Sequence, residues 1–218
     1  HDALPICVRE QELRGLGHRA PGVDPEPVAT GVRSGQRDQL VVVAAQRLVV
    51  ADWLAMEPRY RIGLWAAGKA GWDMAQWSAM QAKLRRALAV DGDNPVLHDY
   101  LGALYALQGR KYWRSEALRR GFFLDARRHQ EASLRLRQVN GRTWASLALS
   151  LHALGAPQER FLHAVRQARY HAPHDPQVHK LVLALLFARR QALPADLDDW
   201  VRSLRANPVT NRNGWIDR

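Results

Sequence analysis

A helical hairpin between Gly141 and Pro173 dictates most of the architecture expected of this chain. Apolar residues recur at three- and four-residue steps in its first half, Gly155 interrupts the pattern, and Phe161 restarts it before the closing proline. Each of the two helices leaves one apolar face, which a neighbouring element has to cover. Because strand-type alternation is scarce elsewhere, the chain is expected to be all-α.

The hairpin is one copy of a repeated pattern. The residue types that begin at Trp144 return 34 positions later at Val178, and a related set begins 46 positions earlier at His98. A step of 34 residues is the tetratricopeptide period, so antiparallel helix pairs stacked in a short right-handed solenoid are expected. The residues predicted to pack one helix on the next are Leu101, Gly102, Tyr105, Trp144, Leu147, Ala148, Leu151, Val178, Leu181 and Leu185.

Capping residues predict where further helices begin and end. Asp73 and Asn94 each precede an apolar-periodic segment, and Pro95 would occupy the first turn of the second helix. Gly109 is expected to end that helix, and a single long helix is expected over residues 111–136. Its predicted inward face consists of Ala117, Leu118, Phe122, Ala126, His129 and Ala132. A last helix is predicted over residues 195–206, with Leu197, Trp200, Val201 and Leu204 on its buried side.

Four segments are expected along the chain. Residues 1–38 have no apolar period and predict a loosely held segment, whose first six residues resemble translated sequencing adapter. Residues 39–57 form a hydrophobic helix. Residues 58–207 form the helical domain, which opens with a glycine-rich stretch predicted to be irregular, and residues 208–218 form a loose tail.

The hydrophobic helix at 39–57 has two interpretations. It is shorter than the roughly 20 residues that span a bilayer, and Gln46, Arg47 and Asp52 interrupt it. Central charges are costly in lipid, by about 2.5 to 3.5 kcal/mol each on insertion scales. The segment is therefore either a weak membrane anchor or a helix that packs along the first helices of the domain.

The charge of the chain points to polyanionic partners. Its formal net charge is +11, and residues 110–142 alone hold ten Arg or Lys against three acidic residues. Nucleic acid, anionic lipid and acidic polysaccharide are the candidate partners, with a solvated helix face as the plainer interpretation. The predicted basic face consists of Arg120, Arg127, Arg128 and Arg135. A basic module that binds nucleic acid is the alternative function, and steep salt dependence would identify it.

No enzyme chemistry is predicted. The sequence has no P-loop, dinucleotide-binding, nucleophile-elbow or zincin motif, and its single cysteine excludes an intramolecular disulfide. Asp196, Asp198 and Asp199 are expected to complement a helix dipole rather than to form a carboxylate site. No catalytic residue, cofactor or metal ligand is assigned.

Helical repeats of this kind bind partners in the groove lined by the first helix of each pair. The predicted partner-binding residues are Asp99, Arg142, His152, His179 and Phe187. The groove positions are otherwise largely apolar. Either the chain's own helix 40–56 fills the groove, or an apolar partner helix docks there.

From about Trp53 to Leu204 the chain resembles the VpsP-type proteins associated with bacterial exopolysaccharide biosynthesis. The likeness is carried by NGRTWASLAL, by LRRALAVDGDNPVLHDYLGALYALQG and by HAPHDPQVHKLV. The sequence departs from that family at Gln46 and Arg47, where an uninterrupted hydrophobic span is expected.

The resemblance implies a helical-repeat protein, anchored at the bacterial inner membrane, whose helical domain lies in the periplasm; a cytoplasmic position and the oligomeric state stay open. The expected function is a non-enzymatic scaffold, accessory to exopolysaccharide synthesis or export, that works through protein contacts. Anionic lipid or polysaccharide is a further expected contact, and nucleic acid is the less favoured partner. The family carries no catalytic residues to transfer.

Overall fold

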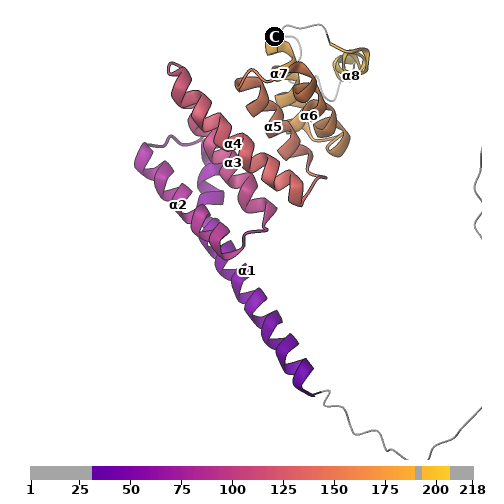
Figure 1. The fold of residues 1–218 in the computed structure, drawn as a ribbon. Helices are drawn as coiled ribbons and strands as arrows, with labels where there is room; N and C mark the ends of the chain where they lie inside the picture. Colours follow the sequence, from indigo (N-terminus) through magenta and orange to yellow (C-terminus); the bar gives the residue numbers. More distant parts are fainter. Residues whose placement is uncertain (1–30, 190–192, 207–218) are drawn as a thin grey trace, which may run out of the picture. The chain divides into compact units, whose positions relative to one another are not determined.

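The computed structural model describes residues 31–189 and 193–206, and this part of the chain is all helical, with no strand (Figure 1). Contacts divide the chain into residues 1–40 and residues 41–218, and the helical packing belongs to the second unit. The expected tail at 208–218 and residues 1–30 lie outside the described residues. The helices are α1 (Gly31–Ala66), α2 (Met74–Val90), α3 (Pro95–Lys111), α4 (Glu116–Leu136), α5 (Gly141–Ala153), α6 (Gln158–His171), α7 (Pro176–Arg189) and α8 (Ala195–Ala206).

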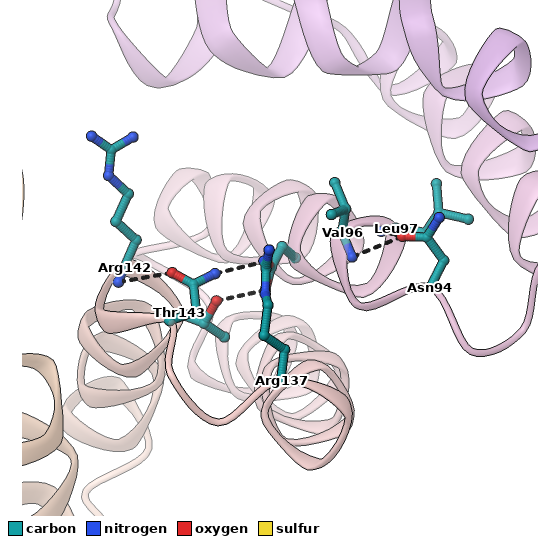
Figure 2. A network of polar contacts seen from close by, with 8 residues as sticks. Asn94, Val96, Leu97, Arg137, Arg142 and Thr143 are labelled. Atoms are coloured by element: carbon teal, nitrogen blue, oxygen red, sulfur yellow. Dashed lines mark hydrogen bonds and ion pairs between the residues drawn. The ribbon is translucent and has the colours of Figure 1, made fainter. Parts of the chain in front are cut away.

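Side chains cap the helices at the predicted residues. Asp73 Oδ1 accepts the backbone N–H of Gln76 at 2.7 Å, and the Gln76 side chain accepts the N–H of Asp73 at 3.1 Å, which completes a capping box on α2. Asn94 Oδ1 accepts the N–H of Val96 at 3.0 Å at the start of α3 (Figure 2). Gly155 follows α5 with φ of 65°, a left-handed conformation that favours glycine.

Helix α1 extends beyond the hydrophobic segment in both directions. It includes residues 31–38, which were expected to be loosely held, and it continues through Pro58, where the sequence predicted an irregular stretch. A proline inside a helix removes one backbone hydrogen bond. Here Pro58 is itself buried, and Ile62 and Trp65 beyond it are buried in a core with α2, α3 and α4. Burial of these side chains compensates for the missing hydrogen bond, so the prediction of irregular chain is wrong up to Ala66, whereas residues 67–72 lie outside any helix as predicted.

Gly109 lies inside α3 and does not end it. The helix runs on to Lys111, and a turn at residues 112–115 separates it from α4. A Cβ atom at Gly109 would lie 3.0 Å from ring atoms of Phe123, so the glycine permits α3 and α4 to approach each other. Tyr112 in the turn stacks on Phe122 with ring centroids 5.4 Å apart. The predicted helix over residues 111–136 therefore starts later than expected.

The helices pack in chain order around two hydrophobic cores. Helix α3 contacts α2 and α4, α5 contacts α4 and α6, and α7 contacts α5 and α6; Figure 1 shows α3 and α4 side by side. One core collects side chains from α1 to α4, and the other collects side chains from α4 to α8. Leu149 of α5 is partly buried and packs against both cores, so α5 connects them.

Two of the four positions that the repeat pattern aligned are buried in every copy. Gly102 of α3, Ala148 of α5 and Val182 of α7 are all buried, and so are the next aligned residues, Tyr105, Leu151 and Leu185. Leu101, Leu147 and Val178 are also buried, whereas Trp144 and Leu181 are half-buried. A Cβ atom at Gly102 would lie 3.0 Å from Gln130 Cγ, so a small residue is needed there.

The buried face of α4 is more polar than predicted. It consists of Phe123, Ala126, Gln130, Ser133 and Leu134, while Ala117 and Leu118, which were expected inside, are exposed. The first turn of α4 therefore lies outside the core, and the apolar spacing there was misleading. Gln130 is admitted to the interior because Gly102 opposite it carries no side chain.

Candidate interaction surfaces

Asp99 of α3 is engaged within the chain. Its Oδ2 accepts hydrogen bonds from Arg137 at 2.9 Å and from Asn140 Nδ2 at 3.1 Å, and its Oδ1 accepts one from the Thr143 hydroxyl at 2.7 Å. These donors come from the end of α4, the following turn and the start of α5. Figure 2 shows this network and labels Arg137 and Thr143. The carboxylate ties α3 to the α4–α5 turn.

Arg142 connects α5 with the turn before α7. Its Nε donates to Asp175 Oδ2 at 2.6 Å. Burial by itself would raise the pKa of Asp175, but hydrogen bonds from Arg142 and from the backbone N–H groups of Gln177 and Val178 hold that pKa below its usual value. The Arg142–Asp175 ion pair thus joins α5 to the turn before α7, just as the Asp99 carboxylate joins α3 to the α4–α5 turn.

The other predicted partner-binding residues lie farther along the same helices. His152, near the end of α5, is half-buried beside Phe161, and burial together with Arg189 and Arg119 lowers its pKa. His179 of α7 is buried against Trp200 with ring centroids 5.5 Å apart, and burial lowers its pKa.

Phe187, near the end of α7, is exposed. Asp99 and Arg142 lie at the start of α3 and α5, whereas His152 and Phe187 lie toward the ends of α5 and α7. The five predicted residues are thus spread along three helices instead of meeting in one cluster.

Much of the predicted groove is occupied by packing among α3, α5 and α7. The repeat pattern also assigns apolar residues of the first helix of each pair to the groove, and five of these are buried in the two cores: Ala106, Leu107, Ala145, Leu183 and Leu186. The helix segment 40–56 was expected either to fill the groove or to leave it to a partner helix. It contributes Ala51 and Ala55 to the core of α1 to α4.

The predicted basic face lies along one side of α4. Arg120, Arg127, Arg128 and Arg135 are separated by seven- and eight-residue steps, which place them on one side of a helix. Two of them are in ion pairs, Arg127 with Glu131 at 3.6 Å and Arg128 with Asp125 at 3.4 Å. Neighbouring carboxylates therefore neutralise part of this face.

Helix α1 has two apolar faces. Ala51, Ala55, Pro58, Ile62 and Trp65 form a buried stripe that packs on the body. An outer stripe of exposed residues lies on the opposite side, at steps of seven, four, three and four residues: Val42, Val49, Trp53, Met56 and Tyr60. Contiguous exposed apolar surface of this kind marks a site that contacts another protein or a membrane.

The polar residues that interrupt this helix have partners inside the chain. Arg47 Nε donates to the carbonyl oxygen of Val90, the last residue of α2, at 2.8 Å. Asp52 pairs with Arg59 at 2.7 Å, and Glu57 pairs with Lys83. These contacts engage the charged groups of α1 without burying them, since the side chains of Asp52 and Glu57 are 67% and 44% exposed. No helix in the described part of the chain combines the length and the apolar content needed to cross a bilayer.

Three adjoining hollows that the sequence does not indicate lie along α6. Two of them, of about 600 and 620 Å³, lie between α4, α5 and α6 and share Trp144, Arg160 and His163. The third, of about 650 Å³, lies between α6 and α8 and shares Arg166 and Gln167 with the others.

The residues of α6 that face these hollows have helical spacing. Arg160, His163, Gln167 and Tyr170, termed the α6 stripe, follow one another at three- and four-residue steps. That spacing is visible in the sequence, but polar residues at such steps are usual on any solvated helix, so it carried no distinct signal.

Among the described residues, no three His, Cys, Asp or Glu side chains come together as metal ligands. No protein-family model matches the chain, and no curated protein and no solved structure matches it either.

Proposed function

We propose that this protein is a non-enzymatic, tetratricopeptide-like scaffold that associates with a bacterial membrane and supports exopolysaccharide synthesis or export through protein contacts. The proposal combines the resemblance of the sequence with two features of the molecule, its successive helix pairs and the outer stripe of α1.

The helix pairs support the repeat-type architecture. Taking α3 with α4, α5 with α6 and α7 with α8 as the pairs, α5 contacts both helices of the pair before it, and α7 contacts both α5 and α6. The aligned small residues Gly102 and Ala148 are buried where helices approach. Hydrogen bonds from Arg119 to the carbonyl oxygen of Ala153 and from Arg189 to that of Ala156 join neighbouring pairs at the end of α5. In repeat proteins such nearest-neighbour contacts build an extended surface for binding other proteins.

The outer stripe of α1 is the observation that carries the proposed membrane association. Its residues lie opposite the buried stripe, so packing on the body leaves them uncovered. Burial of apolar surface contributes about 25 cal/mol per Å², and aromatic residues such as Trp53 and Tyr60 favour the membrane interface. The net charge of +11 adds attraction to anionic lipid.

Vesicle flotation tests this association. The full chain is mixed with vesicles of phosphatidylethanolamine and phosphatidylglycerol, and we expect it to float with the lipid. The double variant Val49→Gln, Trp53→Gln is expected to stay with the soluble fraction, because it removes the centre of the outer stripe. Both side chains are exposed, so the thermal unfolding midpoint should change little.

A second tryptophan provides the matched control. Trp113 is 69% exposed and Trp53 is 68% exposed, but Trp113 lies in the turn between α3 and α4. Trp113→Gln is expected to float like the unaltered chain. Equal loss of flotation in both variants, or no flotation of the unaltered chain, would contradict membrane association through α1.

The role in polysaccharide production is tested in the source bacterium. Cells whose only copy of the gene encodes the double variant are expected to secrete less polysaccharide at an unchanged level of the protein. Normal secretion would argue against the accessory role. Proximity labelling from the C-terminus of α8 then identifies protein neighbours. A set of neighbours that includes no protein of glycan synthesis or export would count against the scaffold.

A further inference from the structure

We infer that the α6 stripe, together with Trp144, is a binding site for an oligosaccharide that contains uronic acid. The inference goes beyond the scaffold role and depends on a different surface from α1. It combines the aromatic rings, the polar groups and the charge of the three hollows along α6.

Aromatic side chains border the hollows at both ends. Trp144 lies beside the first two hollows, and its Nε1–H donates to the carbonyl oxygen of Gln138 at 2.8 Å, which fixes the orientation of the ring. Trp200 and Tyr170 border the third hollow. Trp200 is only 7% exposed and has Arg169 over its ring at 5.4 Å, so the ring available at this end is that of Tyr170, which is 76% exposed. Flat apolar rings with polar groups beside them suit the mixed apolar and hydroxylated faces of a sugar.

Ion pairs along α6 provide fixed donors and acceptors. Arg160 pairs with Glu131 at 3.3 Å, and Arg166 donates to both carboxylate oxygens of Asp196 at 2.8 and 3.0 Å. The hydrogen bonds that Arg166 donates to Asp196 raise the pKa of Arg166 against the smaller opposing effect of burial, so this pair stays charged. A guanidinium beside a carboxylate donates and accepts at neighbouring points, as adjacent sugar hydroxyl groups do.

The charge of the surface favours a sugar over a nucleic acid. Arg160 and Arg166 are already paired with carboxylates, so few cations are left for a densely charged phosphate backbone. Arg135, at the α4 side of the first hollow, is exposed and has no ion-pair partner among the described residues. Arg169, beside the third hollow, donates to the backbone carbonyl oxygen of Asp196 at 3.0 Å and pairs with no carboxylate among the described residues. Two such guanidinium groups match the occasional carboxylates of a chain that contains uronic acid.

Calorimetric titration of the full chain with a hyaluronan hexasaccharide tests the site. This probe alternates a uronic acid with a neutral sugar, and we expect saturable binding. The double variant Arg160→Gln, Tyr170→Ser is expected to weaken binding by about tenfold, since it removes one aromatic contact and one charged donor. The variant should keep its fold, because Tyr170 is exposed and Arg160 is 58% exposed.

Tyr60 provides the matched control, because it is also a largely exposed tyrosine but belongs to α1. Tyr60→Ser is expected to leave hexasaccharide affinity unchanged, and the α6 double variant is expected to float normally with vesicles. Loss of flotation alone would therefore concern the membrane proposal and not this one.

Three outcomes would overturn the inference. One is the absence of hexasaccharide binding, and another is equal affinity in the α6 double variant and the unaltered chain. The third is tighter binding of an oligothymidylate with a steep salt dependence, a slope near −0.7 per phosphate contact on a log–log plot, which would identify a nucleic-acid surface instead.

Discussion

Two histidines form a direct contact between α3 and α4. The Nδ1 atoms of His98 and His129 lie 3.0 Å apart, so one imidazole donates a hydrogen bond and the other accepts it. The His129 ring also stacks on Tyr105, whose hydroxyl accepts a hydrogen bond from Arg85 at 2.9 Å. This arrangement requires that at least one imidazole stay unprotonated.

The surroundings keep the imidazoles neutral. Burial lowers the pKa of His129 to about 4, and the charges of His98, Arg85 and Arg128 act in the same direction. Burial also lowers the pKa of His98, with a contribution from Arg135 that Asp99 opposes. The unfolded chain therefore binds protons more readily than the folded chain on acidification. The contribution of the neutral histidines to the free energy of unfolding is fully present above about pH 6.5 and is lost as the pH falls toward about 4.

Replacement of His129 should reduce the acid sensitivity of folding. We expect His129→Gln to show a smaller difference than the unaltered chain between urea midpoints at about pH 7.5 and about pH 5, because one group that must take up a proton is gone. His174→Gln, an exposed position, is the control and should keep the original difference. An unchanged difference in His129→Gln would show that this contact does not determine the acid response.

At the scale of helices, glycines decide how closely neighbours approach. A Cβ atom at Gly141, the first residue of α5, would lie 2.5 Å from Ala172 Cβ, 2.8 Å from Ala172 N and 2.9 Å from the carbonyl oxygen of Ala168. Backbone atoms of α6 and its C-cap cannot move aside as a flexible side chain can. At Gly121 of α4, by contrast, no atom lies within 4 Å of the same position.

The same substitution is therefore expected to act in opposite directions at the two glycines. Gly141→Ala should lower the free energy of unfolding by about 1–3 kcal/mol through overpacking. Gly121→Ala should raise it by about 0.5–1 kcal/mol, because alanine suits an exposed helix interior better than glycine does. Denaturant titration measures both changes. Stabilisation by Gly141→Ala would mean that α5 and α6 are not in this contact.

At the scale of the whole described body, α4 and α5 join the two cores, since α4 contributes Phe123 to one and Leu134 to the other, and Leu149 of α5 packs against both. Leu104 is fully buried in the core of α1 to α4, and Val165 is fully buried in the core of α4 to α8. Each core contains residues from consecutive helices, as in proteins whose stability is a sum of local units and nearest-neighbour contacts. Such molecules open in parts as well as all at once.

Truncation of a side chain in one core should therefore destabilise the helices of that core more than the helices of the other. Leu104→Ala is expected to lower the free energy of unfolding by about 2–5 kcal/mol and to reduce amide hydrogen-exchange protection in α2 and α3 more than in α6. Val165→Ala is expected to give the reverse pattern. Equal loss of protection in all helices for both variants would indicate a single cooperative unit.

The sequence by itself determined most helix boundaries and the aligned buried positions. Asp73, Asn94 and Gly155 act on atoms within one helical turn, and the 34-residue alignment of Ala148 with Val182 follows from local spacing. Such signals are read without knowledge of neighbours, because capping and helical periodicity depend on residues three or four positions apart.

The tertiary structure alone decided the rest. Pro58 remains inside α1 and Gly109 inside α3 because distant side chains pack against those turns. Asp99 is engaged by donors about 40 residues away, and the hollows along α6 exist only where α4, α5 and α8 come beside it. The physical reason is that interhelical contacts depend on which surfaces meet in space, and a helical pattern shows that a face is apolar without showing what will cover it.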